Sequence, residues 1–199
     1  MDFVFFLFIL PIIAYIYVLL YVRIRKNSGN QLLSGTAPVM KFTVIAAIGL
    51  IIRELYAVSP GVLPFLFYAV LALLSGIDIL IRKIPTELLA VFCVLFVLVI
   101  GDPQDHLSHA ACAALICSVL LVLRKHIGIA LYDIILLFPL LTLSGSTIRQ
   151  LKFISLFLIL WGCAGIILRK TQKQEEPVTV PLVPVAVLCC FLLQRSVTF

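Results

Sequence analysis

The sequence predicts an all-α integral membrane protein, a polytopic transmembrane helical bundle of about eight spans. Apolar residues make up 63% of its 199 residues and charged residues 12%, whereas soluble domains are nearer half apolar and a quarter charged. The mean hydropathy is +1.24. The basic residues behind the net charge of +6 stand in small groups between apolar runs. That pattern is typical of loops between membrane spans and does not indicate nucleic-acid binding.

Eight apolar runs are each close to the ~20 residues that a helix needs to cross a bilayer. Helices are favoured there because they satisfy their own backbone hydrogen bonds in lipid. The predicted spans, which form a single membrane domain over residues 1–199, are 3–22, 41–58, 62–81, 84–101, 107–123, 128–145, 150–168 and 179–196. We expect the first span to be retained, because Asp2 and no basic stretch precedes it and no A-x-A cleavage pattern follows it.

Basic residues predict the orientation of the spans. With eight spans in alternation, eleven of the fifteen Lys and Arg residues fall on one side of the membrane. These eleven are Arg23, Arg25, Lys26, Lys41, Arg82, Lys83, Arg124, Lys125, Arg169, Lys170 and Lys173. Because cytoplasmic loops are enriched in Lys and Arg, this side is predicted to be cytoplasmic and both termini to lie outside.

The cysteine and histidine patterns do not predict a metal site or a cofactor site. All six cysteines lie in apolar runs without a C-x-x-C pair, so we interpret them as packing residues. His106 and His109 follow Asp102 and Asp105 in a segment that we expect to be a solvated outer loop. His126 is expected at the cytoplasmic membrane interface.

Only three acidic residues lie inside apolar runs: Glu54, Asp78 and Asp133. Ionisable residues within membrane spans are costly and suggest a functional site. Glu54 directly follows Arg53 near the outer end of its span, so a local ion pair explains it. Asp78 lies about one turn before the cytoplasmic end of the third span, and Asp133 lies one or two turns after the cytoplasmic start of the sixth. The predicted topology therefore places Asp78 and Asp133 on the same side at similar depth.

Two carboxylates in one site do not readily both ionise, so one stays protonated while the other acts as a base. Such a pair can activate water for attack on an amide and protonate the leaving nitrogen. The alternative from the residues alone is two separate polar anchors, each hydrogen-bonded to a neighbouring helix.

The segment around Asp78 reads "DILIRKIPTEL", with the aspartate seven residues before Pro85. An aspartate at the end of a span, a short basic stretch and then Ile-Pro resembles the first motif of the bacterial type IV prepilin peptidases. Thr86 stands where that family usually has Asp or Asn.

Two further segments resemble motifs of the same family. In "GIALYDIILL", Gly128, Asp133, Leu136 and Leu137 match a glycine-rich G-x-G-D segment followed by a Leu pair. Ala130 and Tyr132 replace two of its glycines, and Ile135 replaces the usual lysine. In "VPLVPVAV", Pro181 and Pro184 match the prolines of a segment in the last span, with Val183 in place of a glycine.

The resemblance spans about residues 62–190 and implies an intramembrane aspartyl endopeptidase of the bacterial inner membrane, with Asp78 and Asp133 catalytic. Its implied partners are pilin-like precursors, whose short basic leader is cut before an apolar helix, and it implies no cofactor. The chain is similar to short family members, because residues 23–41 leave no room for a cytoplasmic domain with paired cysteines.

Two rival interpretations stay open. One is an assembly factor that binds pilin-like helices without cutting them, which Tyr132 beside Asp133 favours. The other is a small transporter that uses the aspartates to carry protons, for which the spacing from Asp78 to Pro85 would be a coincidence.

Overall fold

A computed structural model of the protein describes residues 2–25, 38–58, 61–81, 84–101, 103–127, 129–144, 146–172 and 180–195. These residues form helices and turns and contain no strand. The elements are α1 (Asp2–Val4), the π-helix η1 (Phe5–Ile9), α2 (Leu10–Arg25), α3 (Pro38–Tyr56), α4 (Val62–Ile81), α5 (Thr86–Ile100), α6 (Pro103–Ile127), α7 (Leu131–Leu143), α8 (Thr147–Gln172) and α9 (Leu182–Arg195). Since α1, η1 and α2 are continuous, the described residues contain eight separate helical segments, and the all-α prediction is confirmed.

Among the described residues, three helices have the length and the apolar composition that crossing a membrane requires. They are Val62–Ile81 in α4, His106–Arg124 in α6 and Thr147–Ile166 in α8. Four further apolar helical stretches are shorter: Phe5–Leu20, Thr86–Ile100, Leu131–Leu143 and Leu182–Gln194. Large apolar side chains on α6 and α8 are exposed, up to 79% at Val122. These features are those of a multi-pass membrane protein with three candidate spans.

Prolines mark the beginnings of two helices and a distortion in a third. Pro38 and Pro103 are the first residues of α3 and α6, where the missing N–H has no partner in the helix in any case. Pro11 lies in α2, inside the first helical segment. The π-helical turn Phe5–Ile9 directly precedes α2. An internal proline removes a hydrogen bond and crowds the preceding turn, so a widened turn at this point has a physical cause.

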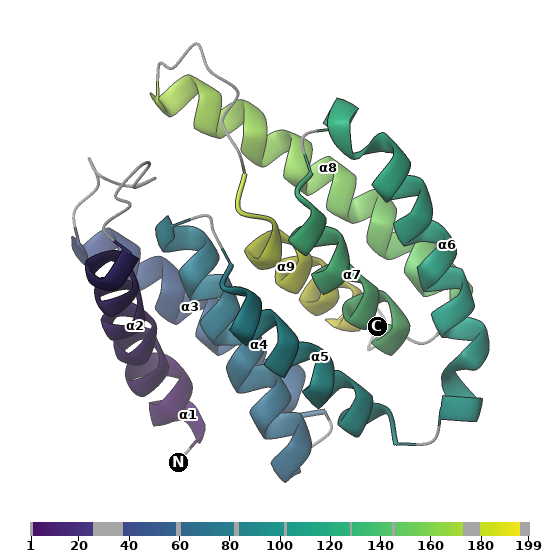
Figure 1. Ribbon diagram of the computed structural model, residues 1–199, viewed down its shortest axis with the longest axis horizontal. Coiled ribbons are helices and arrows are strands. Elements are labelled where there is room, and N and C mark those ends of the chain that lie inside the picture. Colours follow the sequence, from purple (N-terminus) through teal and green to yellow (C-terminus); the bar gives the residue numbers. More distant parts are fainter. Residues whose placement is uncertain are drawn as a thin grey trace. The chain divides into compact units, whose positions relative to one another are not determined.

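The chain divides into two compact units, Met1–Val99 and Ile100–Phe199, and each is described by itself. In the first unit, α2 and α3 pack on α4 (Figure 1). Gly76 of α4 lies at this contact, because a Cβ there would be 3.2 Å from side-chain atoms of both Ala14 in α2 and Ile45 in α3. The absence of a side chain at Gly76 therefore lets the three helices approach closely.

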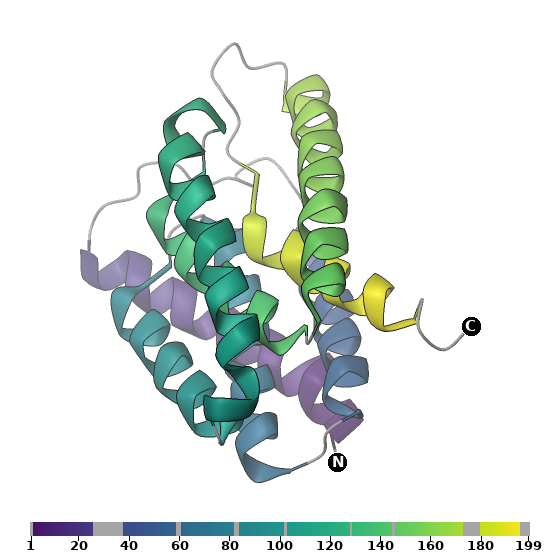
Figure 2. The same cartoon turned by 90° about the vertical axis from the view of Figure 1, so that its right-hand side faces the viewer.

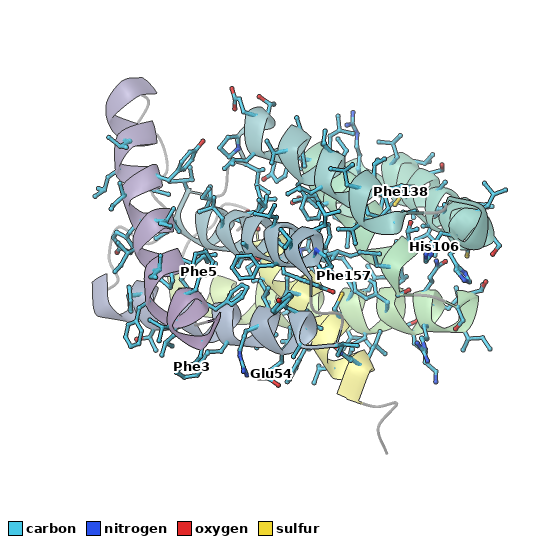
Figure 3. All side chains as sticks on the ribbon, turned by 90° about the horizontal axis from the view of Figure 1, so that it is seen from below. Phe3, Phe5, Glu54, His106, Phe138 and Phe157 are labelled. Atoms are coloured by element: carbon cyan, nitrogen blue, oxygen red, sulfur yellow. The ribbon has the colours of Figure 1, made fainter. Side chains whose placement is uncertain are left out.

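Aromatic ring pairs make further contacts in the first unit. Phe67 of α4 stacks on Phe92 of α5 with a ring-centroid distance of 4.8 Å. Phe5 of η1, which Figure 3 labels, has its ring centroid 5.2 Å from that of Phe65 in α4, and the Tyr56 ring of α3 lies 5.6 Å from Phe65. Such pairs contribute about 0.5–1.5 kcal/mol each beyond the burial of their area.

In the second unit, α7 packs on α6, α8 and α9, and α8 also packs on α9 (Figure 2). A buried amide joins three of these helices. Gln150 of α8 donates from Nε2 to the carbonyl oxygens of His109 in α6, at 2.9 Å, and of Leu141 in α7, at 3.1 Å.

Candidate functional site

Asp78 lies in the last turn of α4, three residues before its end at Ile81. Its side chain is only 2% exposed. Every residue from 74 to 80 is buried, so the carboxylate stands in a helix segment that is covered on all sides. A buried carboxylate needs specific polar partners or a proton, and this requirement makes Asp78 a candidate for a functional role.

The register of α4 shows which way Asp78 is directed. Gly76, Ile79 and Leu80 share one face, since Ile79 and Leu80 cluster with Ile45 of α3 and Gly76 approaches α2 and α3. Asp78 lies on the opposite face, together with Ser75, which precedes it by three residues. The Ser75 hydroxyl donates to the carbonyl oxygen of Leu71 at 2.9 Å. Asp78 is therefore directed away from α2 and α3.

Asp133 is the third residue of α7 and is 6% exposed. Ala130, just before the helix, has an extended backbone with φ −78° and ψ 159°. Its N–H donates a hydrogen bond of 3.0 Å to Oδ2 of Asp133. This is one half of a capping box, in which an acidic side chain at the third helical position binds the backbone N–H of the N-cap residue. Asp133 thus helps to define where α7 begins.

The remainder of α7 explains the burial of Asp133. Leu136, Leu137, Leu140 and Leu141 follow Asp133 by three, four, seven and eight residues, so they share its face, and all are buried. Ile135, on another face, is 37% exposed. The Leu pair of the second motif is therefore part of the core of its unit.

The third motif lies next to the second within the same unit. Pro181 directly precedes α9, and Pro184 is its third residue, a position in the first turn that tolerates proline. Val183 between them is buried. Because α9 packs on α7, the segment "VPLVPVAV" begins a helix that neighbours the helix of Asp133.

Tyr132 is the second residue of α7 and is half-buried. It places an aromatic side chain directly before Asp133, where the resembling motif has a glycine. Gly128, the matching glycine of that motif, lies outside the described residues. Asp78 belongs to the first compact unit and Asp133 to the second, and each is located within its own unit.

The other acidic residue within an apolar run forms the local ion pair that the sequence predicts. Glu54 Oε1 lies 2.6 Å from Arg53 Nη1, and both side chains are more than a third exposed (Figure 3). An exposed pair of this kind contributes little to stability. Glu54 therefore needs no functional explanation.

The expected position of two histidines was wrong. His106 and His109 were predicted in an outer polar loop, but α6 begins at Pro103 and includes both. Pro103 is a favourable first helical residue, and this signal outweighs the polarity of the residues that follow it. The side chains of Asp102, Asp105 and His126 lie outside the described residues.

Two of the cysteines have the packing role that the sequence predicts. Cys117 and Cys189 are buried, and the Cys117 thiol donates to the carbonyl oxygen of Ile134 at 3.8 Å, which joins α6 to α7 beside Asp133. Cys163 is exposed and does not fit this interpretation. In the described part of the chain, no group of three or more His, Cys, Asp and Glu side chains is placed to hold a metal ion.

The fold and these positions define an all-α protein with three candidate membrane spans and two buried aspartates near helix ends. Comparisons with protein-family models, with curated proteins and with solved structures found no match to the chain. The resemblance to prepilin peptidases therefore rests on the three sequence motifs.

Sequence reasoning missed two polar groups. The Ala130 N–H was not considered, although an aspartate three residues after the start of a helix is a known capping signal. Gln150, which is fully buried, stands at the start of the apolar run 150–168. Because Gln150 is an uncharged polar residue in an apolar run, it could have been identified from the sequence as a candidate for an interhelical hydrogen bond.

Proposed function

We propose that the protein is an intramembrane aspartyl endopeptidase that cleaves the leader of type IV prepilin-like precursors at the cytoplasmic face of the bacterial inner membrane. The observation that carries this proposal is the burial of two carboxylates, Asp78 and Asp133, in apolar helices. No other acidic side chain among the described residues is buried to this extent. By resemblance, the first and second sequence motifs assign Asp78 and Asp133 to one catalytic pair.

The predicted topology supports the pairing. If all eight helical segments span the membrane in alternation, α4 ends and α7 begins on the same side. Asp78, in the last turn of α4, and Asp133, in the first turn of α7, are then at similar depth. The register of α4 is compatible with a partner for Asp78 outside α2 and α3, because Asp78 is directed away from these two helices.

The ends of the two helices give the carboxylates different electrostatic surroundings. A helix N-terminus carries partial positive charge and a C-terminus partial negative charge. Asp133, which also accepts the Ala130 N–H, is thus suited to be the ionised base of the pair. Asp78, near the C-terminus of α4, is suited to hold the shared proton.

In the proposed reaction, Asp133 takes a proton from a water molecule as the water oxygen bonds to the scissile carbonyl carbon. Asp78 gives its proton to the substrate, the C–N bond breaks, and the leaving nitrogen departs as an amine. The products are a carboxyl group and a new N-terminus, so one water is consumed. At the end Asp133 holds a proton and Asp78 is ionised, so the pair again carries one proton.

The predicted surroundings suit the substrate class. A pilin-like precursor has a basic leader followed by an apolar helix, so its leader is expected on the cytoplasmic side of the membrane, where Arg82 and Lys83 are also predicted. The apolar helices would accept the apolar part of the precursor in the bilayer. The scissile bond would then lie near the cytoplasmic interface, at the depth predicted for both aspartates.

A second candidate function is a non-catalytic assembly factor that binds pilin-like helices. Two observations favour it. Tyr132 occupies a glycine position of the motif directly before Asp133, and the hydrogen bond from Ala130 gives Asp133 a structural role that does not need catalysis.

The test is co-expression of the protein with candidate prepilins, followed by detection of a leader-sized mobility shift. Asp78→Asn and Asp133→Asn should each abolish the shift, because the pair acts as a unit and neither amide can exchange the shared proton. Glu54→Gln is the matched control, since Glu54 is paired with Arg53 at an exposed position. Cleavage that persists in Asp133→Asn would refute the aspartyl mechanism.

A further inference from the structure

Two basic residues of α8 lie on a surface of the second unit that the proposed proteolysis does not use. Arg149 and Lys152 are the third and sixth residues of α8, and both are exposed. Neither forms an ion pair with a carboxylate of the described residues, and the first turn of α8 has no acidic residue. Arg53, which the predicted topology also places on the outer side, is paired with Glu54. Within the described part of the chain, the two cations of α8 therefore lack the intramolecular anion that Arg53 has.

The packing of α8 shows that Arg149 and Lys152 are directed away from the core of the second unit. Gln150, which lies between them in the sequence, is fully buried and donates to backbone carbonyl oxygens of both α6 and α7. Phe153, three residues after Gln150 and on the same face, is also fully buried. Since Gln150 and Phe153 mark the inward face of α8, the exposed Arg149 and Lys152 lie on its outward face.

The same two turns of α8 expose large apolar side chains. Ile148 is 67% exposed and Leu151 is 55% exposed, as is expected of a surface that faces lipid. The candidate span Thr147–Ile166 has 20 residues, which at 1.5 Å per residue matches the hydrocarbon thickness of about 30 Å. Arg149 and Lys152 lie within the first two turns of this span, so their long side chains can extend to the headgroup region of the bilayer.

We propose that Arg149 and Lys152 bind the headgroup of an anionic phospholipid, whose acyl chains lie against Ile148 and Leu151. The guanidinium can bind the phosphate through two hydrogen bonds, and the ammonium acts as a point charge. A zwitterionic headgroup would bring its own cation beside these two, so a headgroup of net negative charge is favoured. A soluble anion would leave the exposed apolar side chains of the same turns uncovered. The site is independent of the proposed catalytic pair.

The test uses the full-length protein in vesicles of phosphatidylglycerol and phosphatidylcholine in equal amounts. The photo-crosslinking residue benzoylphenylalanine replaces Ser155, which is exposed one turn after Lys152, and mass spectrometry measures the ratio of the two crosslinked lipids. The ratio should favour phosphatidylglycerol by more than about fivefold, because one basic residue near an anionic membrane surface contributes about 1 kcal/mol. Arg149→Gln and Lys152→Gln should each lower the ratio, and the double variant should bring it close to one. The same probe at Val94, exposed in the apolar run of α5, should give a ratio close to one throughout.

Arg53→Gln is the matched control, since it removes an exposed cation that already has a carboxylate partner, and it should leave the ratio at Ser155 unchanged. A second measurement needs no change of a basic residue: added sodium chloride should lower the ratio at Ser155 by screening, whereas inorganic phosphate at constant ionic strength should not. A ratio close to one at Ser155 with both cations present, or a preference that the double variant retains, would overturn the proposal. Loss of the preference on addition of inorganic phosphate would overturn it too, because the site would then bind a soluble anion.

Discussion

Replacing Ala130 with proline removes a single donor at the start of α7. The φ of Ala130 is −78°, which lies within the range that proline imposes. The N–H that would be lost binds Oδ2 of Asp133 at 3.0 Å and lies before the first helical residue, so no hydrogen bond within the helix is removed. A hydrogen bond to a charged group contributes about 1.5–3 kcal/mol, and we expect Ala130→Pro to lower the free energy of unfolding by this amount.

The assay is unfolding of the purified protein in mixed micelles with increasing denaturing detergent. Ala130→Ser is the matched variant, because it keeps the N–H and adds a side-chain acceptor that alanine lacks at this N-cap. It should raise the free energy of unfolding by about 0.5–2 kcal/mol. If Ala130→Pro unfolds as the wild type does, the contact with Asp133 does not stabilise α7 and the capping argument is refuted.

Three further predictions concern packing, orientation and the second motif. Gly49→Ala should destabilise the protein by about 1–3 kcal/mol, because a Cβ there would overlap the backbone carbonyl oxygen of Phe6. Gly162→Ala is the control: a Cβ at Gly162 has no neighbouring atom within 4 Å, so the change should be neutral or stabilising by up to about 1 kcal/mol. A single cysteine at Lys83 should react with a membrane-impermeant reagent only from the cytoplasmic side, and labelling from outside would refute the predicted orientation. Tyr132→Gly should increase cleavage if the tyrosine crowds the substrate; if only this variant cuts and the wild type does not, the assembly-factor interpretation is favoured.

The sequence predicted the helical segments well because apolar runs of sufficient length have few alternatives in a membrane. The run at 62–81 coincides with α4, Val62–Ile81. The start of α6 was missed by four residues, since polar residues after Pro103 were interpreted as a loop. The π-turn at Phe5–Ile9 was not predicted, because hydropathy patterns do not distinguish a widened turn from a regular one.

The orientation of Asp78 could not be predicted, for a physical reason. A helix that is apolar on every side has no polar face to indicate which side meets a neighbouring helix. Residues 74–80 are all buried, and the contacts of Gly76, Ile79 and Leu80 with the neighbouring helices show where α2 and α3 lie. The sequence identified Asp78 as unusual, whereas the direction of its side chain could be assigned only from the packing of α4 on α2 and α3.

Asp133 could serve structure, catalysis or both, and two substitutions separate these roles. Asparagine keeps an oxygen that can accept the Ala130 N–H, so Asp133→Asn should preserve most of the cap while it removes the acid–base function. Alanine removes both. If the proposed peptidase is correct, Asp133→Asn should abolish cleavage with an unfolding free energy close to that of the wild type, and Asp133→Ala should lose cleavage and also be destabilised.

A purely structural aspartate would give a different result: Asp133→Asn would retain whatever activity the wild type has, and only Asp133→Ala would be impaired. Since a carboxylate has about four lone-pair sites, the hydrogen bond from Ala130 does not by itself prevent Asp133 from binding water.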